Sequence, residues 1–314
     1  MAKETEFKET ELKLRCAIES LPALTQLLDS IAKPQGSRQL NNTYYDTVGI
    51  DLAKAKAALR VRENNGQYEQ TLKTRGQSVA GLQMRGEWNW PINSADLDVT
   101  LLQQTEIKGH LPANLTITEL RSIFSTNFQR YTWLFRQNDT LIEVAVDNGQ
   151  VQAGQLSRPL CECELELIEG DVAVLWQLAQ ILGEQAPLWI SDVSKAERGY
   201  LLANLSPSWK KWPYKQQNPE LMLQLQDALV HWQRALEAVV WEDKPAFVSV
   251  AEDALTQVLQ LTKALACSEI ITILAPWRVA PLTDLSNDLK NNKILALSVQ
   301  KVAFAFYQFS EDQK

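Results

Sequence analysis

The segment Glu9-Thr10-Glu11-Leu12-Lys13-Leu14-Arg15-Cys16 decides how the rest of the chain is interpreted. Charged residues stand at positions 9, 11, 13 and 15, and Leu or Cys stands at positions 12, 14 and 16. Because successive side chains of a β-strand point to opposite faces, this alternation predicts a strand with two carboxylates and two cations on one face.

The same separation of charged and apolar residues recurs in five further segments. Each segment alone fits the solvent-exposed face of an antiparallel sheet. Several faces carry charges of one sign, however, and like charges along a strand repel each other unless a counterion or ligand compensates them. Together they predict strands whose charged faces line an interior, at Arg60 and Arg62; Glu69, Lys73 and Arg75; Arg85 and Glu87; Glu143 and Asp147; and Glu162, Glu164 and Glu166.

Two architectures place apolar side chains outside and charged side chains inside. A membrane barrel conflicts with the charged N-terminus, which lacks the apolar stretch of a signal peptide, and with the charged loops. A soluble barrel covered by helices remains, and we expect helices at about residues 20–32, 51–57, 115–126 and 171–183 to cover it. The predicted fold class is therefore α+β, with an antiparallel barrel.

The chain changes character between residues 205 and 218. Before this stretch, short β-patterned runs alternate with turn signals; after residue 219, apolar residues recur at helical spacing and glycine is absent. A chain of 314 residues is long enough for two domains. We predict a β-rich domain at 1–205, a linker at 206–218 and an all-α helical domain at 219–314.

Composition limits the partners and the compartment. With 31 Lys and Arg against 38 Asp and Glu, the net charge is -7, which argues against a dedicated DNA binder. No apolar run is long enough for a membrane-spanning helix. Four cysteines suggest no disulfide framework, and two histidines make a His-built zinc site improbable. We expect a soluble cytoplasmic protein with no DNA or membrane partner.

The predicted interior combines carboxylates with basic side chains. Clustered carboxylates suit a hard divalent cation such as Mg²⁺ or Mn²⁺, and Arg and Lys suit phosphate oxygens. The combination indicates a phosphate chain bound with its metal, a pairing that promotes phosphoryl transfer through positioning and charge neutralisation. The chain lacks the GxxxxGK[ST] loop, so it is not a P-loop NTPase.

Nine segments, in order, resemble the signatures of the CYTH domain, the family of triphosphate tunnel metalloenzymes. The resemblance covers about residues 4–203. The segments are Glu9-x-Glu11-x-Lys13, Asn42-Thr43-Tyr44-Tyr45-Asp46-Thr47, Leu59-Arg60-Val61-Arg62, Thr71-Leu72-Lys73, Arg85-x-Glu87-Trp88, Arg130-x-x-Trp133, Glu143-Val-Ala-Val-Asp147, Glu162-x-Glu164-x-Glu166 and Ser194-Lys195-x-x-Arg198-Gly199.

The first of these signatures fits two registers. Glu4-Thr-Glu6-Phe-Lys8 also matches Glu-x-Glu-x-Lys, and its shift of five residues would turn the opposite face inward. We favour residues 9–13, because Leu12, Leu14 and Cys16 continue the alternation and a predicted helix follows directly.

The resemblance implies an eight-stranded antiparallel tunnel that binds a triphosphate and hydrolyses or rearranges it with Mg²⁺ or Mn²⁺. One ion would bridge phosphate oxygens and a second would position the attacking water. By motif, the metal ligands would be Glu9, Glu11, Asp147, Glu162 and Glu164. The catalytic residues that hold the phosphates would be Lys13, Arg60, Arg62, Lys73, Arg85, Arg130 and Lys195. The residues that orient these basic groups would be Glu69, Glu87, Glu143 and Glu166.

The function expected from the resemblance is hydrolysis of inorganic triphosphate, tripolyphosphate, to pyrophosphate and phosphate. Within the same fold, a thiamine triphosphatase and a class IV adenylate cyclase are alternatives. A non-catalytic binder of polyphosphate or nucleotide is an alternative from another class. The substrate or ligand is in each case a small molecule that contains a phosphate chain.

The C-terminal helices resemble a shortened CHAD domain, a helical module associated with polyphosphate. The region is only about 100 residues long and is not strongly basic, because its Lys and Arg residues are scattered among Glu and Asp. We therefore expect a packing or partner role, with a protein or polyphosphate as the partner.

Overall fold

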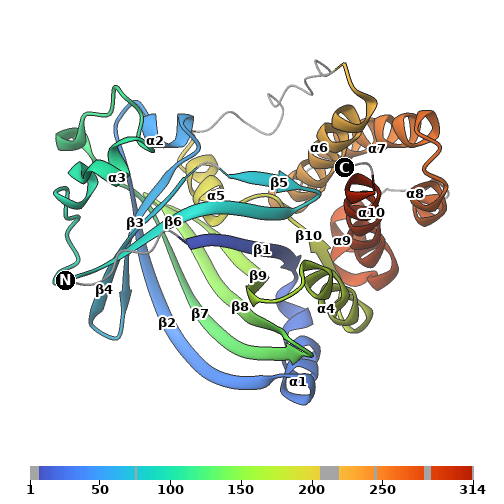
Figure 1. Ribbon diagram of the computed structural model, residues 1–314, viewed down its shortest axis with the longest axis horizontal. Helices are drawn as coiled ribbons and strands as arrows, with labels where there is room; N and C mark the ends of the chain where they lie inside the picture. Colours follow the sequence, from blue (N-terminus) through green and yellow to red (C-terminus); the bar gives the residue numbers. More distant parts are fainter. Residues whose placement is uncertain (1–6, 75, 206–218, 244–245, 279–283, 313–314) are drawn as a thin grey trace.

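The computed structural model describes residues 7–74, 76–205, 219–243, 246–278 and 284–312. Within these residues, ten strands form one antiparallel sheet, and eight of them close into a barrel in the order β1-β9-β8-β7-β2-β3-β4-β6 (Figure 1). The predicted linker at 206–218 lies outside the described residues. The barrel strands are β1 (Phe7–Cys16), β2 (Lys33–Asp46), β3 (Ala58–Asn64), β4 (Gln67–Lys73), β6 (Leu82–Ile92), β7 (Arg121–Gln137), β8 (Thr140–Ala153) and β9 (Leu156–Glu169).

The barrel closes at β1, which changes partners along its length. Glu9 lies opposite Arg85 of β6, whereas Leu14 lies opposite Ile190 of the short strand β10 (Leu188–Ile190). On its other side, β1 pairs with β9 from Glu11 to Arg15. Another short strand, β5 (Gln77–Val79), pairs antiparallel with the first residues of β6, from Leu82 to Met84. The expectation of an eight-stranded antiparallel barrel is confirmed.

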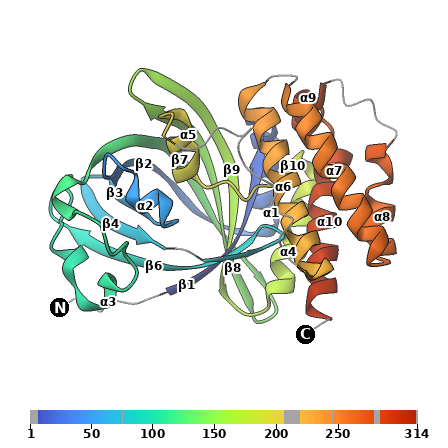
Figure 2. The ribbon, with the colours of Figure 1, turned by 90° about the horizontal axis from the view of Figure 1, so that it is seen from above.

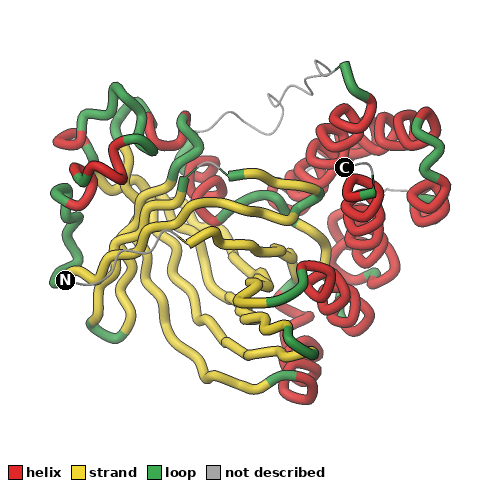
Figure 3. Tube along the Cα trace, viewed as in Figure 1, coloured by secondary structure: helices red, strands yellow, loops and turns green. Residues whose placement is uncertain are grey.

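Helices cover the apolar outer face of the barrel (Figures 2 and 3). Along β9, Cys163 and Leu165 point outward and are fully buried beneath helices. The glutamates that alternate with them therefore belong to the inward face of the strand, as predicted. Burying one such leucine stabilises the fold by about 1.5–3 kcal/mol. The helices beside the barrel are α1 (Leu21–Ile31), α2 (Asp51–Lys54), α3 (Thr105–Lys108), α4 (Val172–Gln185) and α5 (Lys195–Leu202), with 3₁₀ turns at Ile18–Ser20, Leu101–Gln103 and Ile117–Glu119.

The helices after residue 219 pack on one side of the barrel (Figure 2). One hydrophobic cluster runs from the barrel wall through Trp176 of α4 to Trp232 and Phe306, so the two predicted domains share a core. None of the described helices is long and apolar enough to cross a membrane. The C-terminal elements are α6 (Leu221–Glu242), α7 (Ala246–Ala264), α8 (Ser268–Ile273), a 3₁₀ turn at Ala275–Arg278, α9 (Leu285–Asn291) and α10 (Lys293–Glu311).

Two of the four predicted helices near the barrel, 20–32 and 171–183, are confirmed as α1 and α4. The helix expected at 51–57 is reduced to α2, Asp51–Lys54. The helix expected at 115–126 is wrong, because only Ile117–Glu119 forms a 3₁₀ turn and β7 starts at Arg121. Alternate residues of β7, such as Phe124 and Phe128, are buried while their neighbours are partly exposed, and the strand pairs with β2 and β8.

Candidate active site

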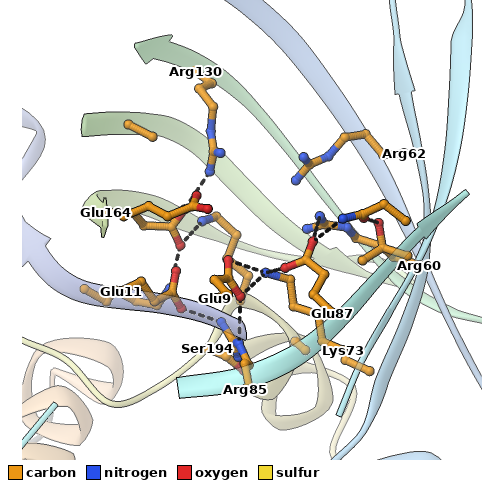
Figure 4. Close-up of a pocket in the computed structure, with 18 of the residues that line it drawn as sticks. Glu9, Glu11, Arg60, Arg62, Lys73, Arg85, Glu87, Arg130, Glu164 and Ser194 are labelled. Atoms are coloured by element: carbon orange, nitrogen blue, oxygen red, sulfur yellow. Dashed lines mark hydrogen bonds and ion pairs between the residues drawn. The ribbon is translucent and has the colours of Figure 1, made fainter. Parts of the chain in front are cut away.

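A cavity of about 470 Å³ occupies the inside of the barrel. Its wall is formed mainly by charged side chains from the barrel strands and from the start of α5 (Figure 4). All of the predicted site residues except Asp147 and Glu162 line it: Glu9, Glu11, Lys13, Arg60, Arg62, Glu69, Lys73, Arg85, Glu87, Arg130, Glu143, Glu164, Glu166 and Lys195.

The structure decides the register of the first strand. Glu9, Glu11 and Lys13 line the cavity, whereas Leu12 and Leu14 are fully buried on the opposite face of β1. The register at residues 9–13 is therefore confirmed. Glu4 and Glu6 of the alternative register lie outside the described residues.

Asp147 and Glu162 are fully buried and do not line the cavity. They form, with Glu164, an acidic cluster in which one oxygen of each residue lies within 4.8 Å of the others. Lys195 Nζ contacts all three residues, at 2.7 Å from Asp147, 2.5 Å from Glu162 and 2.9 Å from Glu164. Arg130 donates two further hydrogen bonds of 2.7 Å to Asp147.

Carboxylate oxygens grouped in this way fit a hard cation such as Mg²⁺ or Mn²⁺. Burial alone would raise the pKa of Glu162, but Lys195, Lys13 and Arg198 outweigh burial and lower it to about 2. Glu162 is therefore ionised at neutral pH, as a metal ligand must be. The Lys195 ammonium lies among the same oxygens, so a divalent ion held by all three carboxylates requires this ammonium to move.

A second acidic group lies where β1 meets β6. Glu9 accepts hydrogen bonds from Lys73 Nζ at 2.9 Å and from Arg85 Nε at 3.2 Å, and Glu11 pairs with the same arginine (Figure 4). Lys73 Nζ also lies 2.6 Å from Glu87. Acidic and basic groups thus balance each other in this half of the cavity.

Arg62 lies apart from these ion pairs (Figure 4). Its Nε donates a hydrogen bond to Asn42 Oδ1 at 2.8 Å, and no carboxylate of the described residues lies within 4.0 Å of its guanidinium. Burial and the neighbouring Arg60 and Arg130 lower the pKa of Arg62 to about 9. At neutral pH the cavity wall therefore carries an uncompensated positive charge here, which favours an anionic ligand.

The four acids that the resemblance assigns to orienting roles differ in their contacts. Glu87 contacts Lys73 and lies 3.9 Å from Arg60, which fits that role. Glu166 makes no ion pair with a described residue, and burial together with Glu9 raises its pKa to about 7. Glu69 and Glu143 line the cavity, likewise without a described ion-pair partner within 4.0 Å.

The three consecutive residues Tyr44, Tyr45 and Asp46 have different roles: the first belongs to the cavity wall and the other two stabilise the fold. Tyr44 lines the cavity, whereas Tyr45 packs outside the barrel beside Trp88. Asp46 accepts hydrogen bonds from the backbone of Leu52 and Ala53, each at 3.0 Å, and so holds the start of α2.

The cysteines of β9 and the tryptophans Trp88, Trp90 and Trp133 face away from the site. Cys161 and Cys163 are buried on the outer side, where Cys161 Sγ lies 3.1 Å from Cys16 Sγ. Trp88 and Trp90 pack against the loops of residues 97–120, and Trp133 donates a hydrogen bond to Asp29 of α1.

The site assigned from the sequence left out three charged residues at the barrel end next to the helices: Arg15, Arg198 and Glu237. Arg198 pairs with Glu162, and Arg15 lies 3.4 Å from Glu237 of α6. The spacing of Arg198, three residues after Lys195 on one helix, was a usable signal. Glu237 comes from a helix far along the chain, and nothing local in the sequence marks it.

Comparisons with known proteins found several that are similar to this chain. The model of the CYTH domain family matches residues 8–200. An inorganic triphosphatase from Haemophilus influenzae is 37% identical over 177 residues, which are 55% of this chain and 49% of that protein. The chain thus spans about half the length of this curated relative.

Two solved structures resemble the barrel. One is a candidate adenylyl cyclase from Hippeastrum with a dominant triphosphatase activity, which is 19% identical over 62% of this chain and 95% of its own, with a TM-score of 0.47. The other is a Pyrococcus horikoshii OT3 protein, 17% identical over 60% of this chain and 97% of its own, with a TM-score of 0.42.

Proposed function

Because the chain belongs to the CYTH domain family, we propose that it is a metal-dependent inorganic triphosphatase. It would hydrolyse tripolyphosphate to pyrophosphate and phosphate inside the barrel. The observation that carries this proposal is the cavity itself, whose wall contains both Glu164 of the acidic cluster and Arg62, an arginine with no carboxylate of the described residues within 4.0 Å. The name of the relative from Haemophilus influenzae supports the same substrate.

The acidic groups are proposed to hold Mg²⁺ or Mn²⁺ through Asp147, Glu162 and Glu164, with Glu9 and Glu11 as further ligands. When bound, the ion would neutralise charge on the phosphate oxygens and lower the pKa of a bound water. Lys195 lines the cavity as well as contacting the cluster, so its ammonium has the phosphates of the substrate as alternative partners.

The basic residues are proposed to position the phosphate chain. Arg62, with Arg60 and Arg130 nearby, offers guanidinium groups that bind phosphate oxygens in pairs, whereas Lys73 and Lys13 act as point charges. Because these groups are buried or partly buried, their attraction for the charge that develops during phosphoryl transfer is less screened than it would be in water. Positioning and charge compensation are the main contributions that this reaction needs from a protein.

Phosphate release tests the proposal directly. The full chain would be assayed with tripolyphosphate, ATP and thiamine triphosphate, each with Mg²⁺ or Mn²⁺, beside Glu11→Ala. We expect the highest kcat/KM with tripolyphosphate and a loss of about 100-fold or more in Glu11→Ala. Glu169→Ala is the matched control, because Glu169 is exposed outside the cavity and should retain full activity.

Other outcomes of this assay select the alternatives. Preference for thiamine triphosphate, or cyclic AMP formation from ATP, would replace the proposed substrate or reaction. If the protein binds tripolyphosphate tightly but hydrolyses none of the substrates, the proposal that it is an enzyme would be refuted, and a non-catalytic receptor would be favoured. Lys195 contacts all three acids of the cluster and could take the place of a metal ion there, which is the reason to test a receptor that works without metal.

For residues 219–314 we propose a short CHAD-like bundle whose role is packing or binding of a protein or polyphosphate partner, and for the chain a cytoplasmic location. The family match ends at residue 200, so the CHAD-like assignment rests on the sequence resemblance alone. The packing role draws support from α10, whose Gln300 donates a 2.6 Å hydrogen bond to the backbone of Leu188 in β10.

A further inference from the structure

Glu237 is a fully buried carboxylate that α6 places at the end of the barrel next to the C-terminal helices. It accepts a 3.0 Å hydrogen bond from Arg198 Nε and a 3.1 Å hydrogen bond from Ser191 Oγ. Arg15 Nε, from β1, lies 3.4 Å from the same carboxylate. A buried charge of this kind is destabilising unless it is paired, and Glu237 is paired with two arginines.

The same arginine connects Glu237 to the acidic cluster. Arg198 is fully buried and pairs with Glu162, so Glu237 and Glu162 share one guanidinium. Glu162 in turn contacts Lys195 at 2.5 Å and Lys13 at 3.7 Å, and both of these cations line the cavity. A chain of three ionic contacts, Glu237 to Arg198, Arg198 to Glu162 and Glu162 to Lys195, thus connects the helical region to the cavity wall.

Helix α6 is also held in place along its length. Gln226 donates a 2.9 Å hydrogen bond to the backbone of Ser78, and Gln233 donates one of 3.2 Å to the backbone of Ala80. Arg234 pairs with Glu197 of α5. These contacts all precede Glu237 in α6, and the last of them lies three residues before it, so the helix is anchored to the barrel within one turn of the Glu237 carboxylate.

We propose that Glu237 is a positioning residue of the active site and that the helical region is thereby part of the catalytic unit. By compensating Arg198, Glu237 limits this guanidinium to one oxygen of Glu162, Oε2. The other oxygen, Oε1, which Lys195 contacts, is then available to a divalent cation once the ammonium moves. The inference rests on the proposed function, because that function assigns Glu162 to metal binding.

Direct measurement of Mn²⁺ binding tests the inference without any turnover. Isothermal titration calorimetry of the full chain with MnCl₂ would compare the unmodified protein with Glu237→Gln, whose side chain has the same shape but no charge. We expect about tenfold weaker Mn²⁺ binding, as is usual when a residue that supports a metal ligand is changed. Glu252→Gln, an exposed change of the same kind on α7, should bind Mn²⁺ as the unmodified protein does.

The activity of the same variant gives a second readout. We expect the Mn²⁺ concentration for half-maximal activity to rise about tenfold, with a smaller change in kcat at saturating Mn²⁺. A purely structural role would instead lower the fraction of folded protein and leave Mn²⁺ affinity per folded molecule unchanged. That result would overturn the inference.

A second variant covers the case in which Glu237→Gln does not fold. Ser191→Ala removes one hydrogen bond to Glu237 and creates no buried charge, and we expect about threefold weaker Mn²⁺ binding. Unchanged affinity in Ser191→Ala would also overturn the positioning role. If the unmodified chain binds Mn²⁺ but hydrolyses no tripolyphosphate, the proposed function fails while the Glu237 comparison still stands.

Discussion

Replacing Arg62 by methionine should make the ligand-free protein more stable and a poorer binder of tripolyphosphate. Arg62 is partly buried in the cavity wall, and burial with Arg60 and Arg130 nearby lowers its pKa to about 9. Because the pKa is lower in the folded than in the unfolded protein, the charge destabilises the fold. This cost is fully present below pH 9 and is relieved as the pH rises from about 9 toward the ordinary value of 12.5.

The size of the effect follows from the same shift. At about 1.36 kcal/mol per pKa unit, the drop from 12.5 to about 9 corresponds to roughly 5 kcal/mol as an upper bound. Water in the cavity screens part of this cost, and the variant loses the hydrogen bond to Asn42. We therefore expect a net gain of about 1–2 kcal/mol at pH 7.5, seen as a rise of about 2–5 °C in melting temperature.

Differential scanning calorimetry in EDTA, with and without tripolyphosphate, measures both parts of the prediction while preventing turnover. At 100 times its dissociation constant, tripolyphosphate should stabilise the unmodified protein by about 2.7 kcal/mol. A tenfold weaker affinity in Arg62→Met would reduce this gain to about 1.4 kcal/mol at the same concentration. Arg136→Met is the matched control, because Arg136 is exposed and pairs only weakly with Glu169.

Two results would refute the reasoning. A lower melting temperature of ligand-free Arg62→Met would mean that the charge of Arg62 is compensated within the fold. Equal stabilisation of both proteins by tripolyphosphate would mean that Arg62 does not face the phosphate chain.

Three further predictions concern metal, substrate and packing. Removal of divalent ions with EDTA should abolish hydrolysis yet lower the melting temperature by less than about 3 °C, because Lys195, Arg130 and Arg198 already compensate the charge of the acidic cluster; a larger fall would contradict that balance. Lys73→Ala should raise KM and lower kcat, each about tenfold, in steady-state assays, and unchanged kinetics would remove Lys73 from the site. Gly149→Ala should destabilise the barrel by more than about 2 kcal/mol in urea unfolding, because a Cβ would lie 2.1 Å from the carbonyl oxygen of Asn127; an unchanged midpoint would show that the strands can separate there.

The charged faces of the strands could be predicted because alternation is local and needs only a few consecutive residues. The register at Glu9 and Glu11 followed from the apolar residues between and after them. Strand β7 was partly missed, because Arg121–Gln137 lacks the separation of charges that marked the others and its first residues read as a helix. Residues that act at a distance along the chain leave no such local pattern.

The sequence could not predict which inward-facing side chains line the cavity and which are buried behind its wall, because that depends on residues far away along the chain. Asp147 and Glu162 follow the same alternation as Glu164, yet only Glu164 lines the cavity. The two buried acids are covered by Lys195 and Arg198, which arrive from α5. Tertiary contacts of this kind decide which carboxylates remain in the cavity wall, and a strand pattern contains no information about them.

The pairing of β1 has a consequence for the order in which the protein folds. Glu11 lies opposite Glu166, and Leu14 lies opposite Ile190, so the first strand needs partners that are synthesised more than 150 residues later. Such long-range pairing is slow, and domains are made from the N-terminus onward at about 5–20 residues per second. We expect barrel closure to be a late folding event, because the acids of β1 and β9 can meet only after translation has passed β9, which ends at Glu169.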